Sequence, residues 1–295
     1  MNIAVSVNNK FVMPLKVMLF SLAQNTERDL VIYLLYCDLD ENKRIEIEKF
    51  VQQYCHGVVR SILVEQGIFR EHDASKSMYS IEAFYRLLIP YILPNDVERV
   101  LWLDADMVVY DEIDEFYDSQ FGTSGEAMLV ACWNEKDKVR IPEYKERLGI
   151  KTDYYFNSGV ILFNIPQIRK HISKEEINDF WIKNQKILYY PDQDILNCLM
   201  GEKTVYKSAT EYNNLSHLEE NGERELLQAK IIHYAFFMKP WLLYYEGKCE
   251  KPFWNYAKQC GYKMHYIFYC IMHKPTLFVY KIYKRVRYGE KIKKS

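Results

Sequence analysis

Two carboxylates stand one residue apart in the stretch VLWLDADMVVY, residues 100–110, and their types and spacing are suited to chemistry. The apolar run Val100–Leu103 is typical of a buried strand, and Met107–Val109 is apolar again. In an extended chain, residues i and i+2 point to the same side, so Asp104 and Asp106 would present their carboxylates together. Two like charges this close repel each other unless a cation lies between them. The pattern therefore favours a divalent cation with oxygen ligands, and such ions commonly bind phosphates as well.

A single D-x-D is a weak motif, because the same pattern occurs in solvated turns that follow strands. Apolar residues on both sides of Asp104-Ala105-Asp106 favour the functional interpretation, since a solvated turn has no need of them. The predicted location favours it too, because ligands of open α/β sheets bind at the carboxyl ends of the strands.

Further polar groups interrupt or border apolar segments. Arg86 lies within residues 75–91, whose apolar positions have helical spacing, and both pairing with a carboxylate and contact with a ligand are open to it. Asn157-Ser158-Gly159 stands at the start of the apolar stretch 154–163. The segment Asp192-Gln193-Asp194 lies where a helix begins; one aspartate is expected to be its N-cap, yet three polar residues in a row exceed what a cap requires.

His233 lies in the short predicted strand 231–234, where a lone histidine is usually a satisfied core residue. A lysine, Lys239, and a tryptophan, Trp241, follow it within eight residues. This combination favours a phosphate or sugar site over a core role.

Strands alternate with helices in the chain, and this order predicts a largely parallel sheet with helices on both faces. The predicted strands are 3–7, 31–36, 58–64, 100–103, 127–133 and 231–234, and the predicted helices are 13–24, 41–54, 175–187 and one that runs to Met200. A ligand crevice is then expected at the carboxyl ends of the strands.

Composition limits the classes of protein that this chain can be. Its 295 residues suffice for one large α/β domain or two small ones, and 49% of them are apolar, so a substantial core is expected. The net charge of −1 gives no indication of nucleic-acid binding. Seven cysteines without a C-x-x-C pattern argue for free thiols in a reducing compartment. With neither a signal-peptide pattern nor an apolar run of ~20 residues, we expect a cytoplasmic protein.

The composition changes near the end of the chain, so we expect a catalytic domain over residues 1–258 and a basic, aromatic tail over 259–295. Residues 262–295 hold nine lysines and arginines against one acid, with aromatic side chains between them. Aromatic rings suit the bilayer interface and basic groups suit anionic lipid, so the tail is expected to dock peripherally on the inner face of a membrane. The alternatives are a solvated basic helix or a helix packed on the catalytic domain.

Five segments in order resemble one known family. They read YSIEAFYRLLIP, VLWLDADMVV, YYFNSGVILFN, YPDQDILN and HYAFFMKPW. With them the chain resembles glycosyltransferase family 8, which contains bacterial lipopolysaccharide galactosyltransferases and glucosyltransferases and the glycogenins. The resemblance implies a GT-A fold, with a Rossmann-like, mixed, mostly parallel sheet flanked by helices. It also implies retaining transfer of galactose or glucose from a UDP-sugar to a glycan or lipid-linked acceptor.

The resemblance assigns roles to individual residues. Asp104, Asp106 and His233 match the metal ligands; Mn²⁺ is implied, with Mg²⁺ as the alternative. Lys239 matches the residue that contacts the diphosphate, where a compact positive charge stabilises the leaving UDP. The donor-binding set is Ser6, Val7, Asn8, Arg86, Asp104, Ala105, Asp106, Asn157, Asp192, Gln193, His233 and Lys239, with Gln193, Asp192 and Lys239 as catalytic candidates.

Three positions depart from the family pattern. Asn8 stands where aspartate is usual, and its amide oxygen can still accept a hydrogen bond from uracil N3–H. Lys10 stands where asparagine is common, which leaves that ribose contact open. Phe236 replaces a frequent glycine, so a different backbone approach to the phosphate is expected there.

Retention of configuration requires either a covalent intermediate or attack from the face of the leaving group. Gln193 is a poor nucleophile, and the resemblance gives Asp192 a hydroxyl-binding role. Same-face attack through an oxocarbenium-like state, assisted by the donor's own phosphate, is therefore the expected mechanism.

Two other functions remain open. DADMV also fits the D-x-D-x-[TV] motif of haloacid-dehalogenase-type phosphatases, with Asp104 as nucleophile and Asp106 as acid/base, although no clear second acidic pair follows. A non-catalytic sugar-nucleotide-binding or glycan-binding protein is the other; the intact set of Asp104, Asp106, His233 and Lys239 speaks against it. The sequence identifies neither the acceptor nor the oligomeric state.

Overall fold

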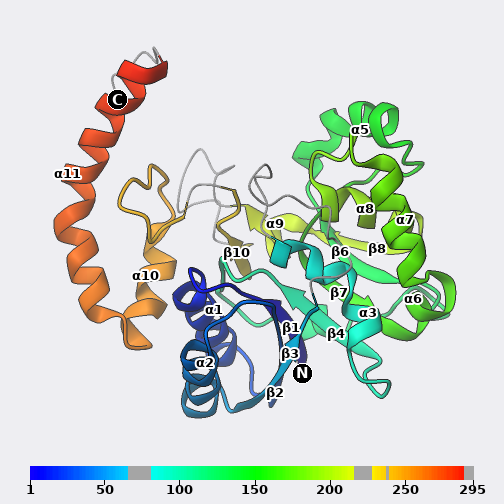
Figure 1. Cartoon of the computed structure of the whole chain (residues 1–295), viewed down its shortest axis with the longest axis horizontal. Helices are drawn as coiled ribbons and strands as arrows, with labels where there is room; N and C mark the ends of the chain where they lie inside the picture. The colour runs from blue at the N-terminus through cyan, green and yellow to red at the C-terminus, as the bar shows by residue number, and fades with distance from the viewer. Residues whose placement is uncertain (66–80, 216–227, 237–238, 289–295) are drawn as a thin grey trace.

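A computed structural model gives the structure of the chain and describes residues 1–65, 81–215, 228–236 and 239–288. The first part of the expected helical segment 75–91 lies outside the described residues, and so do Phe237, Met238 and the tail from residue 289 onwards. The described parts form an α/β structure around one central sheet (Figure 1).

The central sheet has seven strands in the order β3-β2-β1-β4-β7-β6-β8. They are β1 (Asn2–Ser6), β2 (Leu30–Tyr36), β3 (Gly57–Leu63), β4 (Arg99–Leu103), β6 (Leu129–Trp133), β7 (Phe156–Asn164) and β8 (Thr204–Ser208). Four neighbouring pairs are parallel, and β7 runs antiparallel to both of its neighbours. The mixed, mostly parallel sheet expected from the sequence is thereby confirmed.

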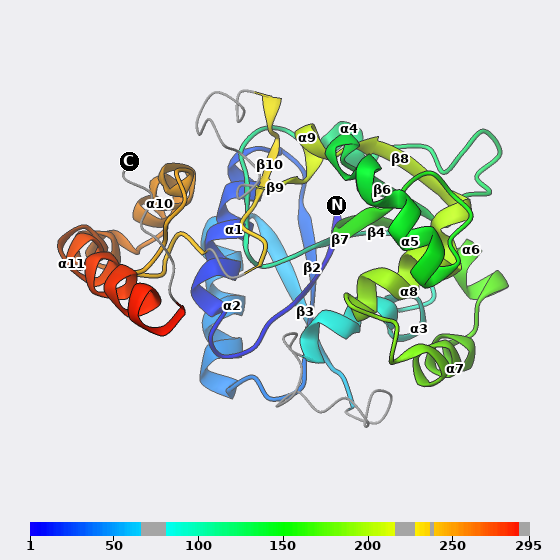
Figure 2. The same cartoon turned by 90° about the horizontal axis from the view of Figure 1, so that it is seen from above.

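Helices lie on both sides of this sheet, as Figure 2 shows. With η for 3-10 helices, they are α1 (Val12–Gln24), α2 (Glu41–Tyr54), η1 (Ile81–Leu87), α3 (Ile89–Ile92), α4 (Asp114–Tyr117), η2 (Glu135–Arg140), α5 (Ile141–Leu148), α6 (Ile165–His171), α7 (Lys174–Asn184), α8 (Pro191–Met200), η3 (Gly201–Lys203), α9 (Ala209–Tyr212), α10 (Glu250–Gln259) and α11 (Lys263–Tyr288). The predicted helix 41–54 has its expected bounds, and the predicted helix 175–187 ends three residues early, at Asn184.

The helical segment expected up to Tyr91 is not one helix over its described part. It divides into η1 and α3, and Pro90 lies in the first turn of α3. Proline has no N–H with which to continue the hydrogen bonds of a preceding helix, but the first turn of a new helix tolerates it.

Successive residues of the central strands face opposite sides, so the sheet has a core on each face. In β4, Leu101 and Leu103 belong to the core that includes α1 and α2. Val100 and Trp102 belong to the core that includes α3, α6, α7 and α8. Because β4 is buried on both faces, its register is firmly set, and so is the position of the residues that follow it.

A second sheet of three strands follows the end of β4. It consists of β5 (Met107–Val109), β10 (Ile231–His233) and β9 (Asn214–Leu215). The strand β10 pairs antiparallel with β5 and parallel with β9, and this register sets His233 opposite Met107. Residues from three distant parts of the chain therefore meet next to the carboxyl end of β4.

The helix α11 stands at the edge of the molecule (Figure 1), and one of its faces packs on the rest of the chain. Tyr269 is 6% exposed within the main core, and the ring centroids of Tyr244 and Tyr280 lie 5.0 Å apart. His273 Nδ1 lies 2.9 Å from Leu243 O. None of the described helices combines the length and the apolar character that a membrane-spanning segment needs.

Candidate active site

The two carboxylates lie directly after β4, at the carboxyl end of the strand. The N–H of Asp104 donates to Gly159 O (3.0 Å), which continues the pairing of β4 with β7, and Trp102 Nε1 donates to Asp104 Oδ1 (2.9 Å). Asp106 leads into β5, and its carbonyl accepts a hydrogen bond from the N–H of Tyr234 (2.9 Å). The backbone on both sides of the pair is thus held by sheet hydrogen bonds, and the carboxylates share one site, as their spacing predicted.

His233 joins the carboxylates through the second sheet. Its Nε2 atom lies 3.7 Å from Asp104 Oδ2 and 3.4 Å from Asp106 Oδ1, and the residue is 2% exposed. One potential ligand atom from each of these residues lies within 4.8 Å of the others. Two carboxylate oxygens and an imidazole nitrogen that converge in this way can hold a divalent cation such as Mn²⁺.

Gly159 leaves room for the His233 ring, because a Cβ atom at position 159 would lie 2.5 Å from His233 Cε1. Gly159→Ala is therefore expected to displace the ring and to weaken Mn²⁺ binding roughly tenfold or more, as measured by calorimetric titration. Gly201→Ala is the matched control, since a Cβ there would meet nothing nearer than 3.6 Å. Equal Mn²⁺ affinity in the two variants would contradict this role of Gly159.

Lys239 compensates the negative charge of one carboxylate, that of Asp106. It is 9% exposed and donates to the Asp106 carboxylate and to Tyr234 O (2.5 Å). Burial works against the ionised form of Asp106, but Lys239 and His233 outweigh it and hold the pKa of Asp106 well below its usual range. Asp106 is therefore ionised at neutral pH and acts only as an acceptor or a ligand.

Arg86 compensates the negative charge of the other carboxylate, that of Asp104. Its guanidinium lies 2.9 Å from Asp104 Oδ1 and 3.2 Å from Asp192 Oδ2. It also donates to Ser158 O (2.5 Å) and lies 4.8 Å over the Trp102 ring. The sequence left open whether Arg86 pairs with a carboxylate or contacts a ligand. Its pairing with carboxylates is confirmed, and its contact with a ligand stays a prediction.

The expectation that Asp192 or Asp194 is the N-cap of α8 is wrong, because the helix begins after Tyr190 and both aspartates lie in its first turn. Asp194 still stabilises this end of the helix. Its Oδ2 atom reaches back and accepts hydrogen bonds from the N–H groups of Tyr189 (2.8 Å) and Tyr190 (3.1 Å). Asp194 is fully buried and is a structural residue, which leaves Asp192 and Gln193 for the site.

Asp192 and Gln193 both contact the start of β7. Burial raises the pKa of Asp192, although Arg86 and the hydrogen bond that Ser158 Oγ donates to Asp192 Oδ2 (2.9 Å) oppose this effect. Gln193 Oε1 accepts hydrogen bonds from Asn157 Nδ2 (3.0 Å) and from the N–H of Ser158 (3.1 Å). Since both acceptor sites of this oxygen are engaged, it is poorly placed to attack a sugar carbon.

These groups line a cavity of about 570 Å³, a size typical of small-molecule sites. Of the donor-binding set expected from the sequence, the lining includes Asn8, Arg86, Asp104, Asp106, Asn157, Asp192, Gln193, His233 and Lys239. Ser6, Val7 and Ala105 stand beside the cavity and outside its lining. Ser6 Oγ donates to Glu82 O (2.9 Å), and Val7 and Ala105 are buried.

The positions that depart from the family pattern lie at this cavity or next to it. Asn8 Oδ1 accepts a hydrogen bond from the N–H of Lys10 (3.0 Å), whose side chain is exposed. Phe236 has a φ of 61°, in the left-handed region that favours glycine. The backbone there thus adopts a conformation that glycine would allow, and the Phe236 ring packs edge-on against Tyr190 at the cavity.

Sequence reasoning missed two parts of the site. Asn213, whose Oδ1 atom lies 2.8 Å from His233 Nδ1, directly precedes β9, and no pattern in the sequence marks it. Four tyrosines also line the cavity, namely Tyr144, Tyr155, Tyr190 and Tyr244. Tyr155 and Tyr190 lie in segments that the sequence analysis singled out, whereas only the abundance of tyrosine pointed to Tyr144 and Tyr244.

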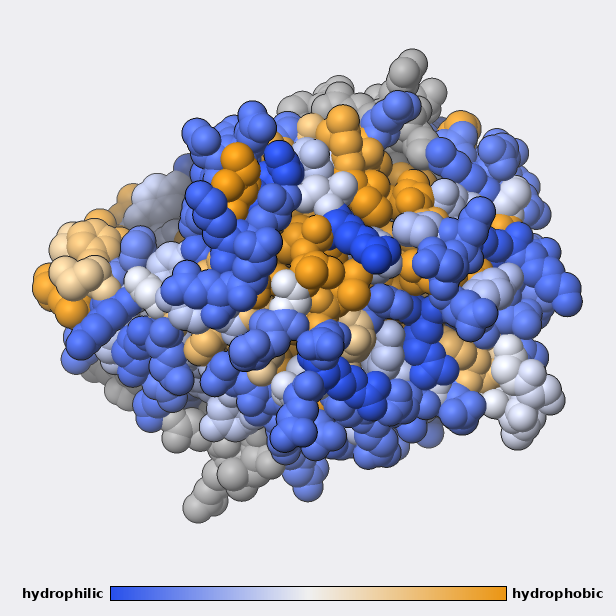
Figure 3. Space-filling view, turned by 90° about the horizontal axis from the view of Figure 1, so that it is seen from below, coloured by the Kyte–Doolittle hydropathy of each residue, from blue (hydrophilic) through white to orange (hydrophobic). Residues whose placement is uncertain are grey.

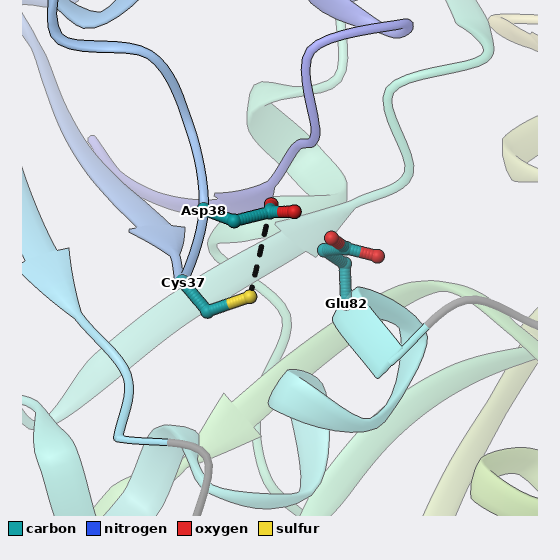
Figure 4. Close-up of side chains that lie close together, drawn as sticks. All are labelled: Cys37, Asp38 and Glu82. Carbon is teal, nitrogen blue, oxygen red and sulfur yellow. Dashed lines mark hydrogen bonds between the residues drawn. The ribbon is translucent and has the colours of Figure 1, made fainter. Parts of the chain in front are cut away.

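A second group of potential ligands, Cys37, Asp38 and Glu82, lies among the described residues at the end of β2 and the start of η1. Figure 4 shows the Cys37 thiol directed at the Asp38 carboxylate, with Glu82 beside them; Sγ lies 3.8 Å from Asp38 Oδ1. None of the three lines the cavity, and the contact of this group with β1 is the hydrogen bond that Ser6 Oγ donates to the Glu82 carbonyl.

The family model for glycosyl transferase family 8 matches residues 2–244 of this chain. A lipopolysaccharide 1,3-galactosyltransferase of Salmonella typhimurium is 26% identical over 253 residues, which cover 81% of this chain and 72% of the relative. A putative glycosyltransferase of Haemophilus influenzae is 25% identical over 208 residues, which cover 70% of this chain and 61% of the relative. A crystal structure of the galactosyltransferase LgtC with donor and acceptor sugar analogs has a TM-score of 0.75 to this chain at 22% identity, covering 88% of this chain and 96% of that one.

Proposed function

The chain belongs to glycosyltransferase family 8, and from this premise we propose that it transfers galactose or glucose from a UDP-sugar to a glycan or lipid-linked acceptor. The expected GT-A fold is confirmed by the likeness to LgtC. Family membership also removes the phosphatase alternative. The observation that best supports the proposed activity is the convergence of Asp104, Asp106 and His233 on one point of the cavity wall.

The chemistry of the three groups fits Mn²⁺, and Mg²⁺ less well, because imidazole suits the softer ion. Asp104, Asp106 and His233 would hold the ion. When bound, it would neutralise charge on the diphosphate of the donor. Lys239 and Arg86, which pair with the same carboxylates, lie close enough to contribute positive charge to the phosphates and to the leaving UDP.

The other residues of the cavity are proposed to bind the donor. Asn8, two residues after the end of β1, is the uridine-binding candidate, and Ser6 and Val7 hold the chain that leads to it. Asp192 Oδ2 pairs with Arg86 and Ser158, and such a fixed carboxylate suits a sugar hydroxyl better than it suits nucleophilic attack. The engaged oxygen of Gln193 likewise supports same-face attack over a covalent intermediate.

A nucleotide-release assay tests the proposed activity. Purified protein with Mn²⁺ and UDP-galactose or UDP-glucose is expected to release UDP slowly by hydrolysis, and faster with a suitable acceptor. Lipid-linked glycans are the acceptors to screen once a donor is identified. If no UDP-hexose yields UDP although the protein binds the nucleotide, the non-catalytic alternative is correct.

The helix α11 supports a second proposal, that the protein docks on an anionic membrane surface. Its exposed apolar residues recur at helical spacing and are Met264, Ile267, Phe268, Ile271, Met272, Phe278, Val279, Ile282, Tyr283 and Val286. At about 100° per residue these positions fall on one face, opposite the face that carries Tyr266, Tyr269, His273 and Tyr280. Figure 3 shows apolar side chains at the left edge of the molecule, where α11 lies. Packing on the catalytic domain and exposure of an apolar face therefore coexist in this helix.

Basic residues accompany the apolar face. Lys263, Lys274, Lys281 and Arg285 fall along one flank of it, and they suit anionic headgroups while the apolar face suits the acyl boundary. Each basic residue near such a surface contributes about 1 kcal/mol. The domain boundary at residue 258 remains a proposal. Truncation there would remove the buried Cys260 and Tyr269, so point substitutions test the surface more cleanly.

The combined change Ile271→Ser, Phe278→Ser and Ile282→Ser is expected to abolish cosedimentation with anionic vesicles, because it removes the centre of the apolar face without touching the packed one. Hydrolysis of the UDP-sugar is expected to be unchanged. The matched control carries serine at three exposed apolar positions elsewhere, Val58, Leu63 and Ile182. If the wild-type protein does not cosediment with the vesicles even at low salt, α11 has a function other than membrane docking.

A further inference from the structure

A chain of hydrogen bonds joins His233 to Gln193, and Asn213 is a link in it. His233 Nδ1 lies 2.8 Å from Asn213 Oδ1, and Asn213 Nδ2 donates to Asn157 Oδ1 (3.0 Å). Asn157 Nδ2 in turn donates to Gln193 Oε1 (3.0 Å). Asn213 is 1% exposed and His233 2%. The metal end and the sugar end of the proposed site are therefore connected through side-chain amides, of which Asn213 is buried and Asn157 and Gln193 are partly buried at the cavity.

Two backbone groups fix the direction in which these hydrogen bonds run. The N–H of Gly159 donates to Asn157 Oδ1 (3.0 Å), and the N–H of Ser158 donates to Gln193 Oε1 (3.1 Å). A backbone N–H can only donate, so each contact identifies which atom of the side-chain amide is the oxygen. Asn157 therefore presents its oxygen to Asn213 and its nitrogen to Gln193.

Asn213 must then turn its amide nitrogen toward Asn157 Oδ1, because two carbonyl oxygens are both acceptors and cannot form a hydrogen bond with each other. Its own oxygen consequently faces His233, and an acceptor 2.8 Å from Nδ1 requires that Nδ1 carries the proton. In the neutral ring Nε2 then has the free lone pair, and this atom faces Asp104 and Asp106.

We propose that Asn213 is a positioning residue that holds His233 in the Nδ1–H tautomer and so makes Nε2 available to a divalent cation. The parallel pairing of β9 with β10 places Asn213 beside the ring. The proposal rests on the metal site of the proposed function. Hydrogen-bond partners of metal-binding histidines typically change metal affinity by roughly 10- to 100-fold when removed, because they fix both the tautomer and the orientation of the ring.

The first measurement uses metal-free protein and needs no activity. With ¹⁵N-labelled histidine, and His233→Gln to assign the signal, NMR is expected to show a proton on Nδ1 of His233 in the wild type, because Asn213 Oδ1 accepts it. Asn213→Ala is expected to reduce the occupancy of Nδ1 by this proton and to leave the ring protonated at Nε2, beside the carboxylates. Asn214→Ala is the matched control: Asn214 is the next residue, is equally buried, and donates to Thr210 O.

The second measurement is Mn²⁺ affinity by calorimetric titration. Asn213→Ala is expected to weaken binding roughly 10- to 100-fold, and Asn213→Asp, which keeps an oxygen for Nδ1–H, is expected to restore most of it. Circular dichroism and thermal unfolding establish that each variant is folded.

Several outcomes would overturn the proposal. A wild-type Nδ1 that carries no proton, an Asn213→Ala variant that behaves like Asn214→Ala, or an Asn213→Asp variant no better than Asn213→Ala would each do so. Failure of the proposed function looks different. Wild-type protein would then bind no Mn²⁺, while the Nδ1 proton would still be lost in Asn213→Ala alone, so the effect of Asn213 on the ring of His233 would stand.

Discussion

Asp104→Asn and Asp106→Asn are each expected to abolish hexose transfer while the fold stays intact. Each change removes one charged ligand from a site that combines two carboxylates with His233. The loss of charge stabilisation at the leaving diphosphate should raise the barrier by several kcal/mol, roughly a 10²-fold or larger loss of rate. Transfer rate and Mn²⁺ affinity are measured together, because both should fall in the same variants.

The two variants differ in how cleanly they test the site. Asparagine at position 104 removes the charge that pairs with Arg86, but Arg86 keeps its pair with Asp192, and the asparagine keeps an oxygen for the hydrogen bond from Trp102 Nε1. The local structure should therefore persist. Asparagine at position 106 removes the charge that pairs with Lys239, and a small loss of stability is expected there. Asp111→Asn, at an exposed aspartate just after β5, is the control that should keep full activity. Near-normal turnover with unchanged Mn²⁺ dependence in both site variants would refute the metal assignment.

The sequence was sufficient for those parts of the fold and site that depend on short-range pattern. The apolar run of β4 predicted a buried strand, and the spacing of Asp104 and Asp106 predicted that their carboxylates would meet. The approach of His233 was implied by the family resemblance, and the structure explains it through the pairing of β10 with β5.

Long-range geometry was beyond sequence reasoning. Asn213 is one polar residue in a polar stretch, and the pairing of β9 with β10 brings it within 2.8 Å of a histidine twenty residues away. The cap of α8 was assigned wrongly for a related reason. An aspartate in the first turn can reach back to preceding N–H groups as Asp194 does, and the sequence does not distinguish this position from the N-cap itself.

Lys239→Met is expected to lower kcat by roughly 10²- to 10³-fold and to change the KM for the UDP-sugar far less. The physical reason is that negative charge on the phosphate grows as the sugar leaves, so a fixed ammonium stabilises the transition state more than the ground state. Methionine keeps most of the buried volume of the lysine and removes only its charge. Lys230→Met is the control, because that lysine pairs with Glu211 outside the cavity lining.

Measuring Mn²⁺ affinity distinguishes a lower kcat caused by the missing ammonium of Lys239 from one caused by loss of the metal ion. Lys239 shares the Asp106 carboxylate with the proposed ion, so its removal should leave metal binding unchanged or tighter, whereas Asp106→Asn should weaken it. A Lys239→Met variant with lower kcat and intact Mn²⁺ affinity would therefore place the lysine at the leaving group. A variant in which only KM rises would show that Lys239 binds the donor equally in ground and transition states. A variant that loses Mn²⁺ as well would show that the lysine maintains the shape of the metal site, and the leaving-group role would then be wrong.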